Sequence, residues 1–452
     1  MQTINVHSVA DTATFNRFHA KVLAWCFLII IIDGYDIAIA GAALPSIMAQ
    51  MGVTAATAGF MASSALFGMM FGAIFLGALS DRIGRRWTIS ICVFLFSVFT
   101  AAAGFATDPV TFSVLRFIAG LGIGGVMPNI VAQMTEYSPR KIRSFLTTAM
   151  FSGYALGGLL AAVIGKQFIV DYGWQVMFFV AGAPILLIPF ILRSMPESLS
   201  LLVRRQHDVS LREVVGKLSP QLKIDFDACF VRPDQQASGG AVMQLFQQGR
   251  GLSTVMFWIA FFTGLFMIYA LSTWLTKLMA MSGYSLGSAL SFVIALNLGA
   301  VVGSLAGGWL ADRFHIKWVL VCMYALGAVF LYLMTIPMAT SWLYIIIGLI
   351  GACTTGAQIV AYAYSGQFYP LAIRSTGVGM ATGIGRLGAI VAPMLIGLIV
   401  TLELPLQQNF MVIAAAGLVG AIALSMIRHE CSASSLPQAE VPAVDVQPQE
   451  RA

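Results

Sequence analysis

The stretch GALSDRIGRRW (Gly77–Trp87) decides the fold, because a closely related stretch, GWLADRFHIKW (Gly308–Trp318), follows at an offset of 231 residues. The same offset relates further identical pairs: Pro139 with Pro370, Arg143 with Arg374, Ser144 with Ser375, Gly120 with Gly351, and Gly125 with Gly356. A single ungapped offset that holds over such a length indicates an internal duplication. The sequence therefore predicts two homologous halves that run in the same orientation.

The composition places both halves in a membrane. Of the 452 residues, 59% are hydrophobic and only 10% are charged, against roughly 25% charged in a typical soluble domain. A helix that crosses a bilayer needs about 20 mainly apolar residues. Windows of that size predict spans at 22–48, 57–79, 87–105, 110–133, 144–166, 174–192, 252–276, 286–310, 318–337, 342–365, 375–400 and 409–427. The predicted fold class is an all-α membrane protein with twelve transmembrane helices in two pseudo-symmetric six-helix bundles.

Polar stretches divide the chain into four parts. Residues 1–192 form the first bundle with its N-terminal segment, and residues 193–250 form a charged linker. Residues 251–427 form the second bundle, and residues 428–452 form a polar tail that is expected to be disordered. The linker is too short and irregular to fold as a substantial separate domain.

All but four of the 25 Lys and Arg residues fall on one side of the predicted spans. The four others are Lys166, Lys277, Arg116 and Arg386. Because positive residues concentrate on the cytoplasmic side of membrane proteins, both termini and the linker are predicted to be cytoplasmic. This distribution also accounts for the formal charge of +6 without a nucleic-acid partner.

The chain offers little for catalysis or for metal binding. Its cysteines are scattered and its histidines fall outside the predicted spans, so neither a disulfide framework nor a metal site is indicated. No pairing of a nucleophile with a base stands out. We therefore expect no cofactor and no metal, and we expect neither an enzyme nor a receptor.

The repeated loop resembles the signature that the major facilitator superfamily carries between helices 2 and 3. The matching residues are Gly77, Asp81, Arg82, Gly84, Arg85 and Arg86, and the second copy keeps Asp312 and Arg313 but has His315 and Lys317 in place of Gly84 and Arg86. The resemblance implies a carrier whose two bundles open alternately to either side of the membrane, with these loops as part of its gate. It also implies a protein that works as a monomer.

Further segments agree with this resemblance. RFIAGLGIGG (116–125) looks like the helix-4 motif, and PES (196–198) closes the first half as it does in many members. DGYD (33–36) resembles helix 1 of the aromatic acid:proton symporter family, which imports benzoate, hydroxybenzoates and related ring acids across the bacterial inner membrane. We therefore expect proton-coupled uptake of such an acid. The alternative is a proton-coupled exporter of drugs or aromatic acids, against which GYALGG (153–158) argues because it lacks the proline that often marks antiporters.

Asp33 and Asp36 lie three residues apart and share one face of the first helix. Counting about 1.5 Å per residue, Asp36 lies about 22 Å from the inner end of that helix, and Arg116 lies about 9 Å from the outer end of the fourth. In a hydrocarbon core about 30 Å thick the two depths are similar, so an ion pair can form. Arg116 then either binds the substrate or neutralises an aspartate.

Arg386 lies about 16 Å into the eleventh helix, among Gly, Ala and Thr neighbours. No acidic residue of the second half lies at its depth. Because a charge inside the membrane needs a partner, Arg386 is the main candidate for the carboxylate of the substrate. The family resemblance implies the same residues, since its members carry acids in helix 1 and arginines in helices 4 and 11.

Proton coupling needs a group inside the membrane whose protonation can change. Since no histidine lies in the predicted spans, a carboxyl group must serve, because burial favours its neutral form and a nearby arginine favours its ionised form. Asp33 and Asp36 are the candidates for this proton site. Glu136, near the inner gate, is a secondary candidate and equally a structural acid paired with Arg140 or Arg143.

An aromatic acid also needs a flat apolar slot. Aromatic side chains on helices 1, 7 and 10 are available for it: Tyr35, Trp258, Phe262, Phe266, Tyr269, Tyr362 and Tyr364. Any of them could equally face lipid or a neighbouring helix, and Tyr35, Phe266, Tyr269 and Tyr362 are the substrate contacts that we predict. Asn129 and Gln358 lie deep in helices 4 and 10, where each would either hydrogen-bond a ring substituent or join two helices.

Overall fold

The computed structural model describes residues 3–205, 208–219, 229–231, 241–370 and 373–432, and these contain 12 helical spans long and apolar enough to cross a membrane. This confirms the predicted number of spans. In the first half they are α2 (Arg17–Met51), α3 (Ala55–Ile83), α4 (Arg85–Ala103), α5 (Pro109–Tyr137), α6 (Arg143–Tyr172), and a sixth span made of α7 (Gln175–Val180), η1 (Ala183–Leu187) and α8 (Ile188–Ser194). In the second half they are α12 (Gly251–Met281), α13 (Leu286–Arg313), α14 (Ile316–Leu333), a tenth span made of α15 (Thr340–Gly351), η2 (Ala352–Gly356) and α16 (Ala357–Phe368), then α17 (Arg374–Thr401) and α18 (Leu406–Met426).

Short elements lie outside the spans. They are β1 (Thr3–Asn5), α1 (Val6–Thr12), α9 (Leu199–Arg204), α10 (Asp208–Leu218), β2 (Cys229–Val231), α11 (Ala241–Gln244) and η3 (His429–Cys431). The sequence predicted helices only, whereas β1 and β2 pair as parallel strands, with Thr3 opposite Cys229. Of the tail that was expected to be disordered, residues 433–452 lie outside the described residues, and Arg428–Ser432 include η3.

Capping residues set the ends of α2 and the start of α5, beyond the predicted apolar spans. Asn16 caps α2 by accepting hydrogen bonds from the backbone N–H groups of Phe18 and His19, so the first span starts earlier than predicted. At its other end Gly52, in the left-handed conformation with φ of 63°, stops the helix. Asp108 caps α5 in the same way as Asn16 caps α2. Hydropathy locates the apolar part of a helix, while capping decides where the helix ends.

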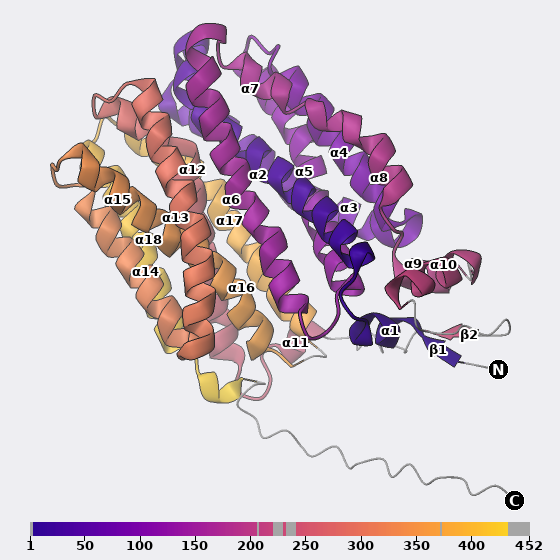
Figure 1. Ribbon diagram of the computed structural model, residues 1–452. Coiled ribbons are helices and arrows are strands. Elements are labelled where there is room, and N and C mark those ends of the chain that lie inside the picture. The colour runs from indigo at the N-terminus through magenta and orange to yellow at the C-terminus, as the bar shows by residue number, and fades with distance from the viewer. Residues whose placement is uncertain (1–2, 206–207, 220–228, 232–240, 371–372, 433–452) are drawn as a thin grey trace, which may run out of the picture.

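Two groups of helices lie side by side in Figure 1, with the first-half spans in indigo to magenta and the second-half spans in orange to yellow. The groups meet where α2 packs on α12, α3 on α17, and α6 on α13. The short elements α1, β1, α9 and α10 lie at one end of the bundle, together with the start of α2. We call this the terminal end and the other the opposite end. The division of the chain at residues 192 and 250 stays a prediction.

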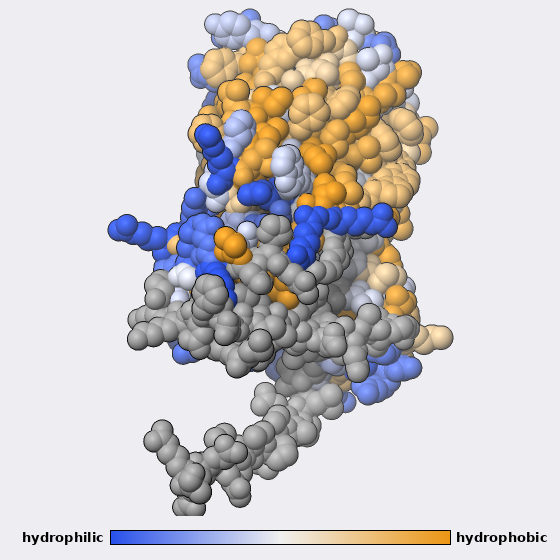
Figure 2. All heavy atoms as spheres, turned by 90° about the vertical axis from the view of Figure 1, so that its right-hand side faces the viewer, coloured by the Kyte–Doolittle hydropathy of each residue, from blue (hydrophilic) through white to orange (hydrophobic). Residues whose placement is uncertain are grey.

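The outer surface is apolar over most of its height. Figure 2 shows an orange face in the upper part of the molecule and blue side chains below it, above the grey segments. Large hydrophobic side chains such as Phe75, Val170 and Ile422 are at least 60% exposed. Apolar surface on this scale is suited to lipid rather than water. The protein is a multi-pass membrane protein.

Candidate functional site

The ion pair expected between Asp36 and Arg116 is present. The Arg116 Nη1 donates to both carboxylate oxygens of Asp36, at 3.1 and 2.9 Å, and to Thr100 Oγ1 at 3.0 Å. Its Nη2 donates to the Asp36 backbone carbonyl oxygen at 3.1 Å. Both side chains are almost completely buried. A buried charge pair with this many hydrogen bonds ties helices together, so the geometry supports Arg116 as the neutralising partner of Asp36 rather than as a substrate contact.

Asp33 lies in a different environment. Its side chain is fully buried, and neither carboxylate oxygen has a hydrogen-bond partner within the described part of the chain. An ionised carboxylate in such a place is costly unless a cation or water compensates it. The charged residue of the other half that interacts with it electrostatically is Arg386 of α17. Asp33 and Arg386 therefore interact electrostatically across the interface between the halves, without a direct hydrogen bond among the described residues.

Arg386 is half-buried, and two tyrosines of the second half interact with it. It interacts electrostatically with Tyr269 of α12 and Tyr362 of α16. Gln358, one helical turn before Tyr362, is held by the Tyr324 hydroxyl at 3.2 Å from its Oε1. Gln358 and Tyr362 lie in α16, directly after the π-helical turn η2. Such turns are frequent at functional sites. Of the predicted substrate contacts, the structure brings Arg386, Tyr269, Gln358 and Tyr362 together.

One face of α17 shows how the two halves meet. On an α-helix, residues spaced alternately by three and four lie on one face, and Gly379, Gly383, Arg386, Ile390, Pro393, Gly397 and Thr401 follow this spacing. Toward the opposite end the face is tightly packed on α3: the Ile390 carbonyl accepts from Ser63 Oγ at 2.8 Å, and Thr401 Oγ1 accepts from the backbone N–H of Ala56 at 2.7 Å.

Toward the terminal end the same face is open. A Cβ atom built on Gly379 or Gly383 would have no neighbour within 4 Å, and both residues are exposed. Arg386 lies between the packed and the open parts of this face. Along this face of α17 the contact with the first half is therefore closed at the opposite end and open at the terminal end, with Arg386 at the boundary.

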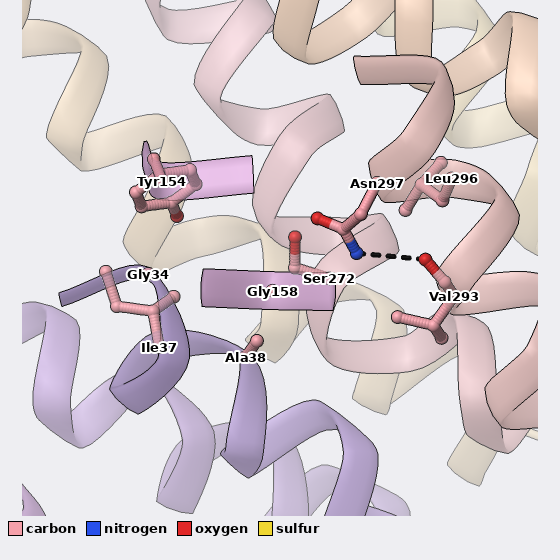
Figure 3. A pocket seen from close by; sticks show the side chains of 9 residues that line it. All are labelled: Gly34, Ile37, Ala38, Tyr154, Gly158, Ser272, Val293, Leu296 and Asn297. Carbon is pink, nitrogen blue, oxygen red and sulfur yellow. Dashed lines mark hydrogen bonds between the residues drawn. The ribbon is translucent and has the colours of Figure 1, made fainter. Parts of the chain in front are cut away.

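Small residues make the closure at the opposite end tight. A Cβ atom on Gly41 would lie 1.8 Å from the carbonyl oxygen of Ser272, and one on Gly158 would lie 2.4 Å from Asn297 Oδ1. Figure 3 shows a cavity of ≈ 20 Å³ beside this contact, bordered by Tyr154, Ser272 and Asn297, whose Nδ2 donates to the Val293 carbonyl at 2.9 Å. It has room for about one water molecule, so the closed part of the interface excludes a ring acid.

A larger cleft, of ≈ 400 Å³, lies between α2 and α6 toward the terminal end. Its lining consists of Ala20, Leu23, Ala24, Phe27, Ala149 and Ser152. None of the predicted site residues borders it. The cleft is therefore separate from the Arg386 site.

The repeat loop of the first half is held by Glu136 and Glu197. Glu136 pairs with Arg85 and accepts a hydrogen bond from Ser198 Oγ at 3.1 Å. The sequence favoured Arg140 or Arg143 as the partner of Glu136. In the structure Arg143 pairs with Asp11 near the N-terminus. The sequence did not reveal these partners because they depend on how distant segments meet at the terminal end. These contacts support a structural role for Glu136 and give no support to a role in proton coupling.

Glu197 caps the start of α4. Its Oε1 accepts hydrogen bonds from the backbone N–H groups of Arg85 at 2.7 Å and Arg86 at 3.3 Å, where the positive end of the helix dipole favours a carboxylate. Gly84 has a φ of 105°, and a Cβ atom there would lie 2.5 Å from Glu197 Oε2. Only glycine fits this position. The Asp81 side chain lies outside the described part, and Gly77 and Arg82 belong to the last turns of α3.

The second copy of the loop is built differently. Asp312 and Arg313 are exposed, and the Arg313 guanidinium lies 5.0 Å from the centre of the Trp309 ring. His315, which replaces the special glycine, packs edge-on against His429, with ring centres 4.6 Å apart. Burial lowers the pKa of His429, and the charges of His315 and Lys317 lower it further. The duplication is therefore preserved in the helices and lost in the gate contacts.

Three predicted substrate contacts have other partners in this arrangement. The Tyr35 hydroxyl donates to the Met177 carbonyl oxygen at 3.1 Å in the sixth span. Asn129 Nδ2 donates to the Gly125 carbonyl oxygen, one turn earlier in its own helix, at 2.8 Å. Phe266 is buried in the core. The geometry supports helix packing for these side chains and gives no support to substrate binding.

Two residues near Arg386 were not singled out from the sequence. Tyr154 of α6 interacts electrostatically with Asp33 and with Tyr269 of the other half, and Phe151, one turn earlier, stacks on Tyr362. The sequence did contain a signal for them: Phe151, Tyr154 and Gly158 are spaced so that they lie on one face of α6, a helix that packs against the second half. Among the described residues, no group of three or more His, Cys, Asp or Glu side chains could hold a metal ion.

Comparisons with known proteins agree with this geometry. The sequence matches the family described as Major Facilitator Superfamily over residues 26–304 and 293–448. It is 42% identical to the benzoate transport protein of Acinetobacter baylyi, over 94% of this chain and 92% of that protein. It is 36% identical to the gentisate transporter of Corynebacterium glutamicum, over 91% and 87%, and 33% identical to the 4-hydroxybenzoate transporter PcaK of Pseudomonas putida, over 95% and 97%.

Solved structures share the fold. The inward-open conformation of the xylose transporter XylE from E. coli superimposes with a TM-score of 0.71, covering 90% of this chain and 96% of that one at 17% identity. At such low identity the likeness extends to the arrangement of helices alone.

Proposed function

Because the chain belongs to the major facilitator superfamily and, within it, to the aromatic acid transporters, we propose that it takes up an aromatic monocarboxylate together with a proton. Benzoate or a hydroxybenzoate is the expected substrate, since relatives that carry benzoate, gentisate and 4-hydroxybenzoate cover nearly the whole chain. The observation that carries the proposal is the position of Arg386. It is half-buried, it interacts electrostatically with an acid of the other half, and it lies where the open face of α17 ends.

Competition for Arg386 explains how proton and substrate would be coupled. A ring carboxylate that pairs with Arg386 displaces the interaction of this arginine with Asp33. Asp33, buried and without a hydrogen-bond partner in the described part, then loses its compensating charge, and its neutral, protonated form becomes the less costly one. Substrate and proton bind together, and one proton with one monoanion moves no net charge.

We place the terminal end in the cytoplasm, because all but four of the 25 Lys and Arg residues belong to segments on that side. The arrangement closed at the opposite end is then the inward-facing state. Rocking of the halves about the Arg386 level would open the other side. A single chain contains the whole site, so the protein is proposed to act as a monomer.

The test is uptake of labelled benzoate and 4-hydroxybenzoate by proteoliposomes with the outside made acidic. Because neutral benzoic acid crosses lipid by itself, protein-free vesicles give the baseline, and counterflow at equal pH measures the carrier alone. We expect accumulation above the baseline, loss of accumulation with a protonophore, and competition by gentisate but not by benzamide, which lacks the carboxylate.

Two results would contradict the proposal. Counterflow no faster than in protein-free vesicles would mean that these acids are not substrates. Expulsion of label from whole cells that express the protein, driven by the same acidic exterior, would identify the exporter instead.

A further inference from the structure

An aromatic pair crosses the interface between the halves beside Arg386. The rings of Phe151 in α6 and Tyr362 in α16 have centres 6.3 Å apart and planes only 4° from parallel. The first belongs to the N-terminal half and the second to the C-terminal half. Both side chains are partly exposed, unlike the aromatic residues that fill the core. A third flat ring between them would need the two rings about 7–8 Å apart, so a small separation of the halves would admit it.

The orientation of Tyr362 is fixed from behind. Phe261 of α12 packs edge-on against it, with ring centres 5.0 Å apart and planes at 89°. This arrangement is favourable because the ring edge is positive and the ring face is negative. Phe261 and Tyr362 both belong to the second half, so this contact does not depend on Phe151. The tyrosine is therefore held in place independently of its partner across the interface.

Phe261, which packs on Tyr362, also lies next to the carboxylate site: a Cβ atom on Gly385, the residue before Arg386, would be 3.0 Å from the Phe261 backbone carbonyl oxygen. Tyr362 interacts electrostatically with Arg386, the residue proposed to pair with the substrate carboxylate. In benzoate and its relatives the carboxylate is bonded directly to the ring. A carboxylate on Arg386 therefore leaves the ring within reach of the side chains that surround this arginine.

We propose that Phe151 and Tyr362 form the subsite for the aromatic ring, which stacks on them while the carboxylate pairs with Arg386. This inference rests on the proposed function and names the two side chains of that same site that would distinguish a planar ring from a saturated ring of the same size. Because one ring of the pair comes from each half, a stacked substrate contacts both halves at once. Aromatic stacking of this kind corresponds to about 2- to 10-fold in affinity.

The experiment compares benzoate with cyclohexanecarboxylate, which has the same charge and nearly the same size but no aromatic face. Each acid competes with labelled benzoate for binding to the purified full-length protein. Phe151→Leu should weaken benzoate binding about 3- to 10-fold and change cyclohexanecarboxylate binding less than about 2-fold, so that the preference for the aromatic acid collapses. Phe151→Tyr should retain the preference.

The matched control is Phe145→Leu, on the same helix with a side chain that is 70% exposed. It should leave both affinities unchanged. If Phe151→Leu does not fold, Phe151→Met gives the same test, since it also removes the aromatic face and keeps the volume.

The outcomes separate the two proposals. Wild-type protein that binds benzoate, with a preference that Phe151→Leu leaves intact, overturns the ring subsite alone. An equal loss for both acids also overturns it, because that result indicates general packing. Wild-type protein that binds neither acid overturns the proposed function and the subsite with it.

Discussion

The two carboxyl groups of the first helix lie three residues apart and have opposite environments. Asp36 receives hydrogen bonds from Arg116 on both oxygens, within its own half of the molecule. Asp33 has no hydrogen-bond partner in the described part, and the arginine that interacts with it electrostatically, Arg386, belongs to the other half. A pair inside one half stays together when the halves rock, while a pair across the interface is remade in each state.

This difference assigns different tasks to the two acids. A carboxyl group whose compensating charge never leaves has no reason to exchange its proton during the cycle. A carboxyl group whose compensating arginine lies in the other half and also pairs with the substrate does have a reason to exchange its proton. The comparison therefore points to Asp33 as the proton site and to Asp36 as a structural residue, a distinction that the sequence alone left open.

The largest effect should come from breaking the buried pair. Arg116→Met leaves the Asp36 carboxylate buried without its partner, which should cost about 3–5 kcal/mol of stability. We expect little folded protein and a strongly lowered melting temperature in detergent. The double variant Asp36→Asn with Arg116→Met should be more stable than Arg116→Met alone, because it leaves no buried charge. Normal melting of Arg116→Met would show that the pair is not structural.

Arg386→Ala should act on binding rather than on folding. It removes the proposed partner of the substrate carboxylate, and losing a charge-assisted contact of this kind costs about 2–4 kcal/mol, roughly 30- to 1,000-fold in affinity. The protein should still melt as the wild type does, since Arg386 is half-buried at an open face. Benzoate affinity measured by calorimetry decides the matter, and unchanged affinity would remove Arg386 from the site.

Asp33→Asn should separate transport from the proton gradient. The amide cannot take up a proton, so a pH difference of one unit, which can drive about tenfold electroneutral accumulation, should drive none. Exchange of internal for external benzoate should persist, because it needs no net proton movement. Asp36→Asn provides the contrast: any folded fraction should still accumulate substrate. Uphill accumulation by Asp33→Asn would place the proton elsewhere.

The sequence predicted the fold because hydropathy and an ungapped repeat act over long segments. It also predicted the Asp36–Arg116 pair, since depth along a helix follows from counting residues. It did not predict that Arg386 interacts with Asp33 or that Glu136 pairs with Arg85. Those contacts depend on the rotation of each helix about its axis and on the meeting of distant loops, which composition does not encode. Tyr35 is the same kind of case, because adjacency to two acids in sequence says nothing about its direction.

The smallest effect should come from Tyr35→Phe. The hydroxyl donates one hydrogen bond, to the Met177 carbonyl oxygen at 3.1 Å, and removing it should cost about 1 kcal/mol of stability. Benzoate affinity should stay the same, because the ring remains packed beside the Asp36 pair and away from Arg386. Tyr362→Phe is the matched comparison: it removes a hydroxyl that interacts with Arg386 and should alter affinity. A change of affinity in Tyr35→Phe would mean that the face of the first helix that carries Asp36 also reaches the substrate. The assignment of Asp36 as a purely structural residue would then be wrong.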